Sequence, residues 1–153
     1  MSKKSKQTAV VISQEKLAEG IYDLWIETGL AKEAGAGQFI GVYPKNAATL
    51  LPRPISICEV NEERMALRLV YRVAGKGTTE FSSLKKDDRI EILGILGNGY
   101  RVPELLTGHP EFTEITLYGG GIGIPPMLQL SKELRQQEGN HRYFWDIVTV
   151  ICF

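Results

Sequence analysis

The sequence predicts a mainly β protein in which a small antiparallel, Greek-key-like barrel is followed by the start of an α/β domain. From Thr8 to about Ile95, short strand-like runs are separated by turn residues, as in barrels and sandwiches. From Glu114, a short strand is followed at once by glycines and then by a helix, which is the order of an α/β unit. We expect a tail over residues 1–7, the barrel over 8–102 and the α/β part over 103–153.

The expected barrel strands alternate apolar and polar side chains. Tyr22, Leu24 and Ile26 would face inward, with Asp23 and Glu27 outward. A short helix is expected after Gly77, because hydroxyl residues that can cap a helix precede two spaced apolar residues. The expected strands are Val10–Ile12, Tyr22–Glu27, Gln38–Tyr43, Arg53–Val60, Met65–Val73 and Arg89–Leu93.

The α/β part is expected to be incomplete. A strand at Ile115–Tyr118 leads into Gly119–Gly123, and Pro125 to Gln137 has helical spacing of its apolar residues. The apolar run Tyr143–Phe153 would form a second, buried parallel strand. One βαβ unit takes about 30 residues, so the chain beyond Ile115 holds little more than one unit of a Rossmann-like fold.

Composition excludes several classes of function. Hydrophobic residues make up 43% and charged residues 24%, as in ordinary globular proteins. Lys and Arg total 18, as do Asp and Glu, so we expect neither nucleic acid nor a membrane surface as partner. No run approaches the roughly 18 apolar residues that span a bilayer, so we expect a cytoplasmic protein. Cys58 and Cys152 lack metal-site spacing and His109 and His141 lack catalytic neighbours, so we predict neither a metal site nor a catalytic residue.

The run Arg53-Pro54-Ile55-Ser56 is the first candidate binding motif. An arginine offers a planar fork of donors suited to a phosphate, which lysine does not reproduce. Pro54 fixes the local backbone, and the Ser56 hydroxyl is small enough to hydrogen-bond the edge of a flat ring. Taken alone, the run is more typical of an edge strand with an exposed arginine.

The second candidate is Gly75-Lys76-Gly77-Thr78, in which Gly75, Gly77 and Thr78 place backbone N–H groups at the start of a short helix. Just upstream, Val70-Tyr71-Arg72 offers a ring that could stack on a ligand and a guanidinium that could reach a phosphate or ribose. The alternatives are a plain β-turn and a core tyrosine.

The third candidate is the run that contains Gly119, Gly120, Gly121 and Gly123, between a strand and a helix. This context places a pyrophosphate at a helix N-terminus, although the dinucleotide fingerprint spacing and its acidic ribose ligand are missing. Close packing of strand on helix is the alternative. Three anion-binding loops in this order favour a barrel that holds a flavin dinucleotide, followed by a nicotinamide-binding segment.

These motifs resemble the ferredoxin–NADP reductase superfamily and, within it, the electron-transfer subunits of dihydroorotate dehydrogenase B. The resemblance extends from about Lys16 to Glu138. It includes Gly37-Gln38-Phe39, Leu51–Cys58, Leu69–Val73, Gly75–Thr78, Gly94–Gly99 and Gly119–Pro126.

The resemblance implies an FAD-binding barrel, in which Arg53–Ser56, Val70–Arg72 and Gly77-Thr78 line the flavin and Gly119–Gly123 begins an NAD site. In the family, electrons pass between NAD and FAD, and through a 2Fe-2S cluster to the FMN of a dihydroorotate dehydrogenase catalytic subunit. That partner oxidises dihydroorotate to orotate in pyrimidine biosynthesis, within a heterotetramer.

The family's cluster cysteines lie beyond the length of this chain, and Cys58 and Cys152 do not replace them. We therefore expect a truncated or frame-shifted chain that retains FAD but neither exchanges electrons with NAD nor acts alone. The alternatives are a sulfide dehydrogenase or NADH–ferredoxin type flavin reductase subunit, and a barrel that binds a partner without any cofactor.

Overall fold

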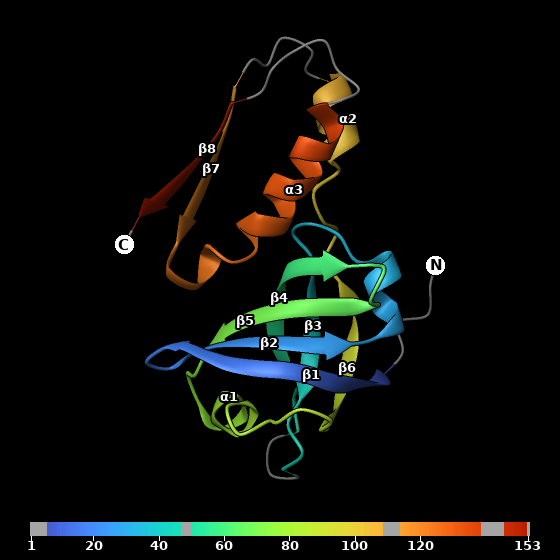
Figure 1. Cartoon of the computed structure of the whole chain (residues 1–153), viewed down its shortest axis with the longest axis vertical. Coiled ribbons are helices and arrows are strands. Elements are labelled where there is room, and N and C mark those ends of the chain that lie inside the picture. The colour runs from blue at the N-terminus through green and yellow to red at the C-terminus, as the bar shows by residue number, and fades with distance from the viewer. Residues whose placement is uncertain (1–5, 47–49, 109–113, 139–145, 153) are drawn as a thin grey trace.

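The protein is built around a closed antiparallel barrel of six strands, described here from a computed structural model (Figure 1). The structure describes residues 6–46, 50–108, 114–138 and 146–152. The barrel order is β1-β2-β5-β4-β3-β6, so the mainly β fold with an antiparallel barrel is confirmed. The strands are β1 (Lys6–Ala18), β2 (Ile21–Glu27), β3 (Phe39–Tyr43), β4 (Arg53–Asn61), β5 (Ala66–Arg72) and β6 (Arg89–Leu96).

Alternation along the strands fills the barrel with aliphatic side chains, as predicted. In β5, Leu67 and Leu69 are fully buried, whereas Arg68 between them lies on the outer wall. Asp23 departs from the prediction, because it is only 8% exposed although it points away from the interior. Its carboxylate is covered by Arg68, which pairs with it across the sheet.

A short helix, α1 (Lys76–Phe81), closes one end of the barrel. Gln14 holds it there, because its amide nitrogen donates to the carbonyls of Phe81 and Leu84, each at 3.0 Å. The amide oxygen of the same residue accepts the Tyr71 hydroxyl at 2.8 Å. One glutamine therefore joins β1, β5 and α1. The short helix predicted after Gly77 is present, but it begins earlier, at Lys76.

The second part of the chain forms a parallel strand pair with a crossover helix. β7 (Glu114–Gly120) pairs with β8 (Asp146–Cys152) in parallel, which confirms the predicted second strand. Between them lie the 3-10 turn η2 (Gly121–Gly123) and helix α3 (Met127–Glu138). The predicted start at Pro125 is two residues too early, and the predicted stop at Gly139-Asn140 lies outside the described residues. Two further elements are η1 (Gly29–Glu33) and α2 (Val102–Gly108).

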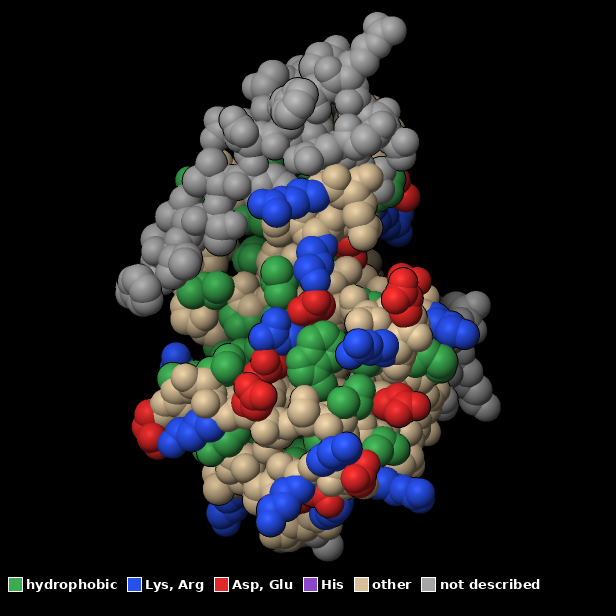
Figure 2. Space-filling view, viewed as in Figure 1, with side chains coloured by type: hydrophobic (Ala, Val, Ile, Leu, Met, Phe, Trp, Pro, Cys, Tyr) green, Lys and Arg blue, Asp and Glu red, His purple; other side chains and the backbone are tan. Residues whose placement is uncertain are grey.

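Helix α3 packs against β4 of the barrel and against β7, and Figure 1 shows it above the barrel and beside the strand pair. Its Leu130 and Leu134 pack with residues of α2 and β7 in a second core cluster, which also includes Ala36, Val102, Leu106 and Leu117. Of the described helices, none is long and apolar enough to cross a membrane. Lys and Arg side chains are interspersed with Asp and Glu on the face shown in Figure 2, in line with the balanced composition.

Candidate functional site

A cavity of about 430 Å³ lies where β4 begins, β5 ends and α1 starts, and we call it the arginine cavity. The barrel topology places β4 beside β5, so two of the predicted motifs meet here although Val70 comes 14 positions after Ser56 in the sequence. The lining residues are Arg53, Pro54, Ile55, Ser56, Val70, Tyr71, Arg72, Ala74, Thr78 and Ile122.

Arg53 is held at the edge of this cavity with most of its donors available. Its Nη1 donates to the Leu51 carbonyl at 2.8 Å, and the described part of the chain offers this side chain no other acceptor. The guanidinium lies against the first turn of α1, where a Cβ built on Gly77 would stand 2.8 Å from Arg53 Nε. Gly77 is therefore required for close packing rather than for an unusual backbone angle.

The Gly75–Thr78 loop is closed by the Thr78 hydroxyl. This oxygen accepts the backbone N–H groups of Ala74 at 2.8 Å and Gly75 at 3.1 Å, and it donates to the Gly75 carbonyl at 3.0 Å. The Gly75 N–H is thus already bonded within the loop. The groups that can face a ligand are the amides of the first turn of α1, which begins at Lys76.

The side chain of Tyr71 is part of the barrel core and does not present its ring face to the cavity. Its side chain points into the barrel, is 2% exposed and stacks on Tyr22 with ring centroids 5.7 Å apart. The ring of Phe81 meets it edge-on at 6.2 Å, and burial raises the pKa of the Tyr71 hydroxyl. The core alternative for Tyr71 therefore matches the structure, while its neighbours Val70 and Arg72 point to the outer surface.

The glycine run after β7 reaches the arginine cavity through its middle residues. Ile122 lines the cavity, and the backbone of Gly121 has a φ of +51°, a left-handed conformation that suits glycine. A Cβ on Gly121 would lie 3.6 Å from Arg72 Nη2. None of Gly119, Gly120, Gly121 and Gly123 is itself in the lining of this cavity, and a Cβ on Gly119 would stand 3.0 Å from Ile124 Cα. Gly119 thus serves close packing of strand on turn.

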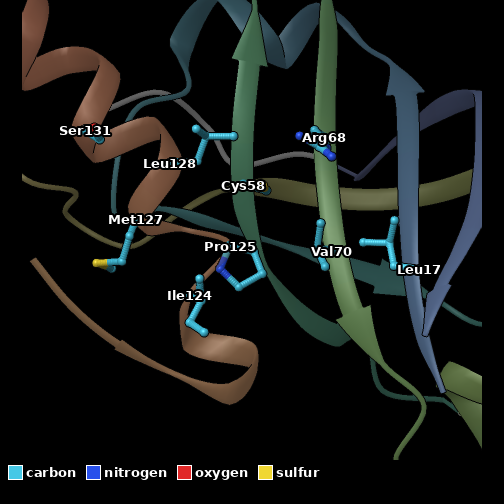
Figure 3. A pocket seen from close by; sticks show the side chains of 9 residues that line it. All are labelled: Leu17, Cys58, Arg68, Val70, Ile124, Pro125, Met127, Leu128 and Ser131. Carbon is cyan, nitrogen blue, oxygen red and sulfur yellow. The ribbon is translucent and has the colours of Figure 1, made fainter. Parts of the chain in front are cut away.

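A second cavity, the helix cavity, of about 340 Å³, separates the barrel wall from the start of α3 (Figure 3). Figure 3 shows Leu17, Arg68 and Val70 on the barrel strands opposite Ile124, Pro125 and Leu128. Cys58, Met127 and Ser131 complete the lining. Val70 borders both cavities, so the two lie side by side along the outer face of β5.

An ion-pair cluster supports the wall of the helix cavity. Arg68 donates from Nε and Nη2 to the Asp23 carboxylate, at 2.9 Å and 2.7 Å, and from Nη1 to Glu59 at 3.2 Å. The bond to Asp23 raises the pKa of the guanidinium. Lys132 of α3 also pairs with Glu59, so two cations meet two carboxylates here. Burial raises the pKa of the neighbouring Cys58 thiol to about 11, which keeps it protonated.

The two cavities together suit a ligand with an anionic part and an apolar flat part. The arginine cavity has two guanidinium groups and no carboxylate in its lining, which favours a phosphate. The helix cavity is lined mainly by aliphatic side chains, proline and methionine. A dinucleotide that carries a pyrophosphate and an aromatic ring has both parts, and the residues present fit such a group.

Sequence reasoning missed the helix cavity and two residues of the arginine cavity, Ala74 and Ile122. Ile122 could have been found, because it is the one apolar side chain inside the glycine run. Cys58 could also have been found, since it follows Ser56 at the two-residue spacing of one strand face. Arg68 has the same two-residue spacing from Val70 on β5, whereas Leu128 gives no such signal in the sequence.

Comparison with known proteins confirms the predicted resemblance. The chain is 37% identical over 147 residues to the dihydroorotate dehydrogenase B (NAD(+)) electron transfer subunit of Streptococcus pneumoniae strain R6, covering 96% of this chain and 54% of the relative. It is 41% identical over 124 residues to the Listeria welshimeri subunit of that name, covering 81% and 47%. The chain thus spans about half the length of the curated relatives it matches. No protein-family model matches it.

Solved structures show the same fold. A NADH-dependent reduced ferredoxin-NADP oxidoreductase superposes with a TM-score of 0.78 at 28% identity, over 94% of this chain and 47% of that one. Ferredoxin-NADP+ reductase from Plasmodium falciparum, as its H286L mutant, superposes with a TM-score of 0.73 at 16% identity, over 95% and 59%. The mainly β barrel with a following α/β segment is therefore the fold of ferredoxin–NADP reductases.

Proposed function

Since this chain is a relative of the dihydroorotate dehydrogenase B electron-transfer subunits, with the fold of ferredoxin–NADP reductases, we propose that it binds FAD as part of such a subunit. The arginine cavity carries this proposal. Arg53 and Arg72 come from neighbouring strands and line the cavity together with Thr78 of α1, and the lining contains no carboxylate. An anionic dinucleotide is the ligand class that this arrangement favours.

Each candidate residue then has a role that follows from its position. Arg53 would bind the pyrophosphate with the donors that Leu51 leaves available, together with the first amides of α1. Gly77 lets that side chain approach the helix, and Thr78 fixes the loop that Gly75 begins. These groups orient the ligand rather than react with it.

The ring of the dinucleotide would lie along the outer face of β4 and β5, toward the helix cavity. Ser56 is exposed at the arginine cavity and can hydrogen-bond a ring edge, and Val70 offers an apolar contact where the two cavities meet. Bound FAD would supply the redox chemistry, while these residues would hold and orient it. The aliphatic lining beyond Val70 would keep water away from that ring.

The proposal for the whole protein extends further. An NAD site would begin at the glycine run Gly119–Gly123, and a 2Fe-2S cluster held elsewhere would pass electrons to an FMN-containing dihydroorotate dehydrogenase catalytic subunit. The name of the curated relatives supports NAD and that partner enzyme. The pathway served would be pyrimidine biosynthesis in the cytoplasm.

Reconstitution with FAD tests the proposal. The purified chain is titrated with FAD, FMN and riboflavin, and binding is followed by flavin fluorescence and isothermal calorimetry. We expect FAD to bind most tightly, because only FAD carries a pyrophosphate, and Arg53→Ala to weaken it by about tenfold. Arg89→Ala, which removes an exposed arginine of β6, is the matched control. Equal affinity for FAD and riboflavin would contradict a pyrophosphate site.

A second candidate function is that of a flavin reductase subunit with another electron partner. The structural similarity to the NADH-dependent reduced ferredoxin-NADP oxidoreductase, which is 28% identical to this chain, favours it. Electron transfer from the FAD-loaded chain to ferredoxin, but not to a dihydroorotate dehydrogenase catalytic subunit, would support it. A cofactor-free barrel is the remaining alternative, and it requires that no flavin binds and that Arg53→Ala changes nothing.

A further inference from the structure

Helix α3 completes an edge of the barrel that β3 leaves unpaired. On one side of β4, β5 pairs with residues up to Asn61, whereas on the other side β3 pairs only with Arg53–Ser56. Beyond that point the backbone N–H of Val60 donates to the side-chain oxygen of Gln129 at 2.8 Å. Gln129 is 9% exposed, so a buried amide side chain takes the place of a neighbouring strand.

A second, partly buried contact lies one turn further along the helix. Glu133 Oε1 accepts the backbone N–H of Ala36 at 2.8 Å, and it also accepts the side-chain nitrogen of Gln129 at 3.0 Å. Gln129, Lys132 and Glu133 have the three- and four-residue spacing of one helix face. Two hydrogen bonds to barrel backbone and the ion pair from Lys132 to Glu59 therefore fix both the distance and the rotation of α3.

The same helix carries the turn that reaches the arginine cavity. Gly121 and Ile122 lie only a few residues before Met127, where α3 begins, and Ile122 lines the cavity beside Arg72. A shift of α3 on the barrel would move this wall of the cavity. We propose that Gln129 and Glu133 are positioning residues that couple the docking of α3 to binding of the dinucleotide.

This inference rests on the proposed function, and it adds a reciprocal effect. If docked α3 raises the affinity for FAD, then bound FAD must stabilise the docking of α3 by the same factor. The backbone amides of Val60 and Ala36 report docking directly, because each donates to a side chain of α3. Their hydrogen exchange is measurable with or without any cofactor.

The experiment measures amide exchange by NMR and FAD affinity by fluorescence, on the full chain. Gln129→Leu keeps the volume of the side chain but removes its hydrogen bonds, and Glu133→Leu does the same at the second contact. Gln136→Leu is the matched control, because it makes the same Gln-to-Leu substitution on the exposed face of α3. Glu133→Gln keeps an oxygen that can accept the Ala36 N–H and should restore docking. The exchange of Leu69 in the barrel core reports global stability.

We expect Gln129→Leu to raise exchange at Val60, and Glu133→Leu at Ala36, by about fivefold or more, and both to weaken FAD binding by about fivefold or more. FAD should slow the exchange of both amides in the unmodified chain. Gln136→Leu and Glu133→Gln should match the unmodified chain.

Three results would overturn the inference, and they are distinguishable. Faster exchange at Val60 and Ala36 with unchanged FAD affinity would show that docking and binding are independent, while the proposed function stands. If the unmodified chain binds no FAD, the proposed function fails and the coupling fails with it, even where Gln129→Leu still frees the Val60 amide. Faster exchange at Leu69 as well would show that Gln129 acts on the whole fold and not on docking.

Discussion

Arg53 lies directly against the backbone of Gly77, so that a Cβ built at position 77 would stand 2.8 Å from Nε and 3.1 Å from Cγ of the arginine. Gly77→Ala should push the guanidinium away from the first turn of α1. We expect FAD affinity to fall by about tenfold, because the arginine and the helix amides no longer converge. Gly108→Ala, where a Cβ meets nothing within 4 Å, is the control for isothermal calorimetry. If Gly77→Ala and Gly108→Ala bound FAD with equal affinity, Gly77 would have no role in the binding site.

Gln14 is expected to be essential for the stability of the closed barrel end. Gln14→Leu removes three hydrogen bonds, including the acceptor of the buried Tyr71 hydroxyl. The loss should lower the free energy of unfolding by about 2 kcal/mol, since an unsatisfied buried hydroxyl adds its desolvation cost. Urea denaturation followed by circular dichroism measures this, with Gln7→Leu on the exposed part of β1 as control. A change below the control's would refute the assignment.

The Asp23–Arg68 ion pair should contribute far more to stability than an exposed pair. The side chains are 10% and 26% exposed, so Asp23→Ala leaves a partly buried guanidinium with Glu59 as its one remaining carboxylate. We expect a loss of about 3 kcal/mol in the same denaturation assay. Glu19→Ala breaks the exposed Lys16–Glu19 pair and should cause no measurable change. Similar losses in the two variants would contradict this account.

The Cys58 thiol should make the fold sensitive to alkaline pH. Its pKa is raised from 9.0 to about 11 by burial, so the folded state disfavours the thiolate. This contribution to stability is complete below about pH 9 and is lost as the pH rises toward 11, because the unfolded chain releases the proton first. The free energy of unfolding of Cys58→Ala should therefore fall less steeply over that window than that of the unmodified chain. Parallel curves would show that Cys58 does not titrate in this way.

The barrel was predictable because apolar and polar side chains alternate along its strands, and the apolar ones must face the interior. Leu24 and Ile26 are buried, as their spacing indicates. Strand β1 was predicted only at Val10–Ile12, yet it extends from Lys6 to Ala18, because much of its length is exposed and held by backbone pairing to β2 and β6. Helix α2 was missed because a segment as short as Val102–Gly108 carries too few apolar residues to set a period.

The candidate site was predictable where neighbouring strands and local turns create it. The Arg53–Ser56 and Val70–Arg72 runs lie side by side, and the loop at Gly77 and Thr78 closes against Arg53. The helix cavity could not be foreseen, because it depends on how a helix near the C-terminus packs on strands far away in sequence. The burial of Tyr71 follows from its two-residue spacing from Leu69, whereas its hydrogen bond to Gln14 and its stacking on Tyr22 depend on other strands.

The short reach of β3 along β4 has a consequence for anyone who would build chimaeras from this family. This barrel is not a self-contained unit, because the Val60 N–H finds its acceptor, Gln129, in the segment that follows the barrel. Grafting a foreign nucleotide-binding half onto this barrel would succeed only if the incoming helix supplies an acceptor at the equivalent place. Recombination points should therefore be chosen after α3 and not at the end of β6.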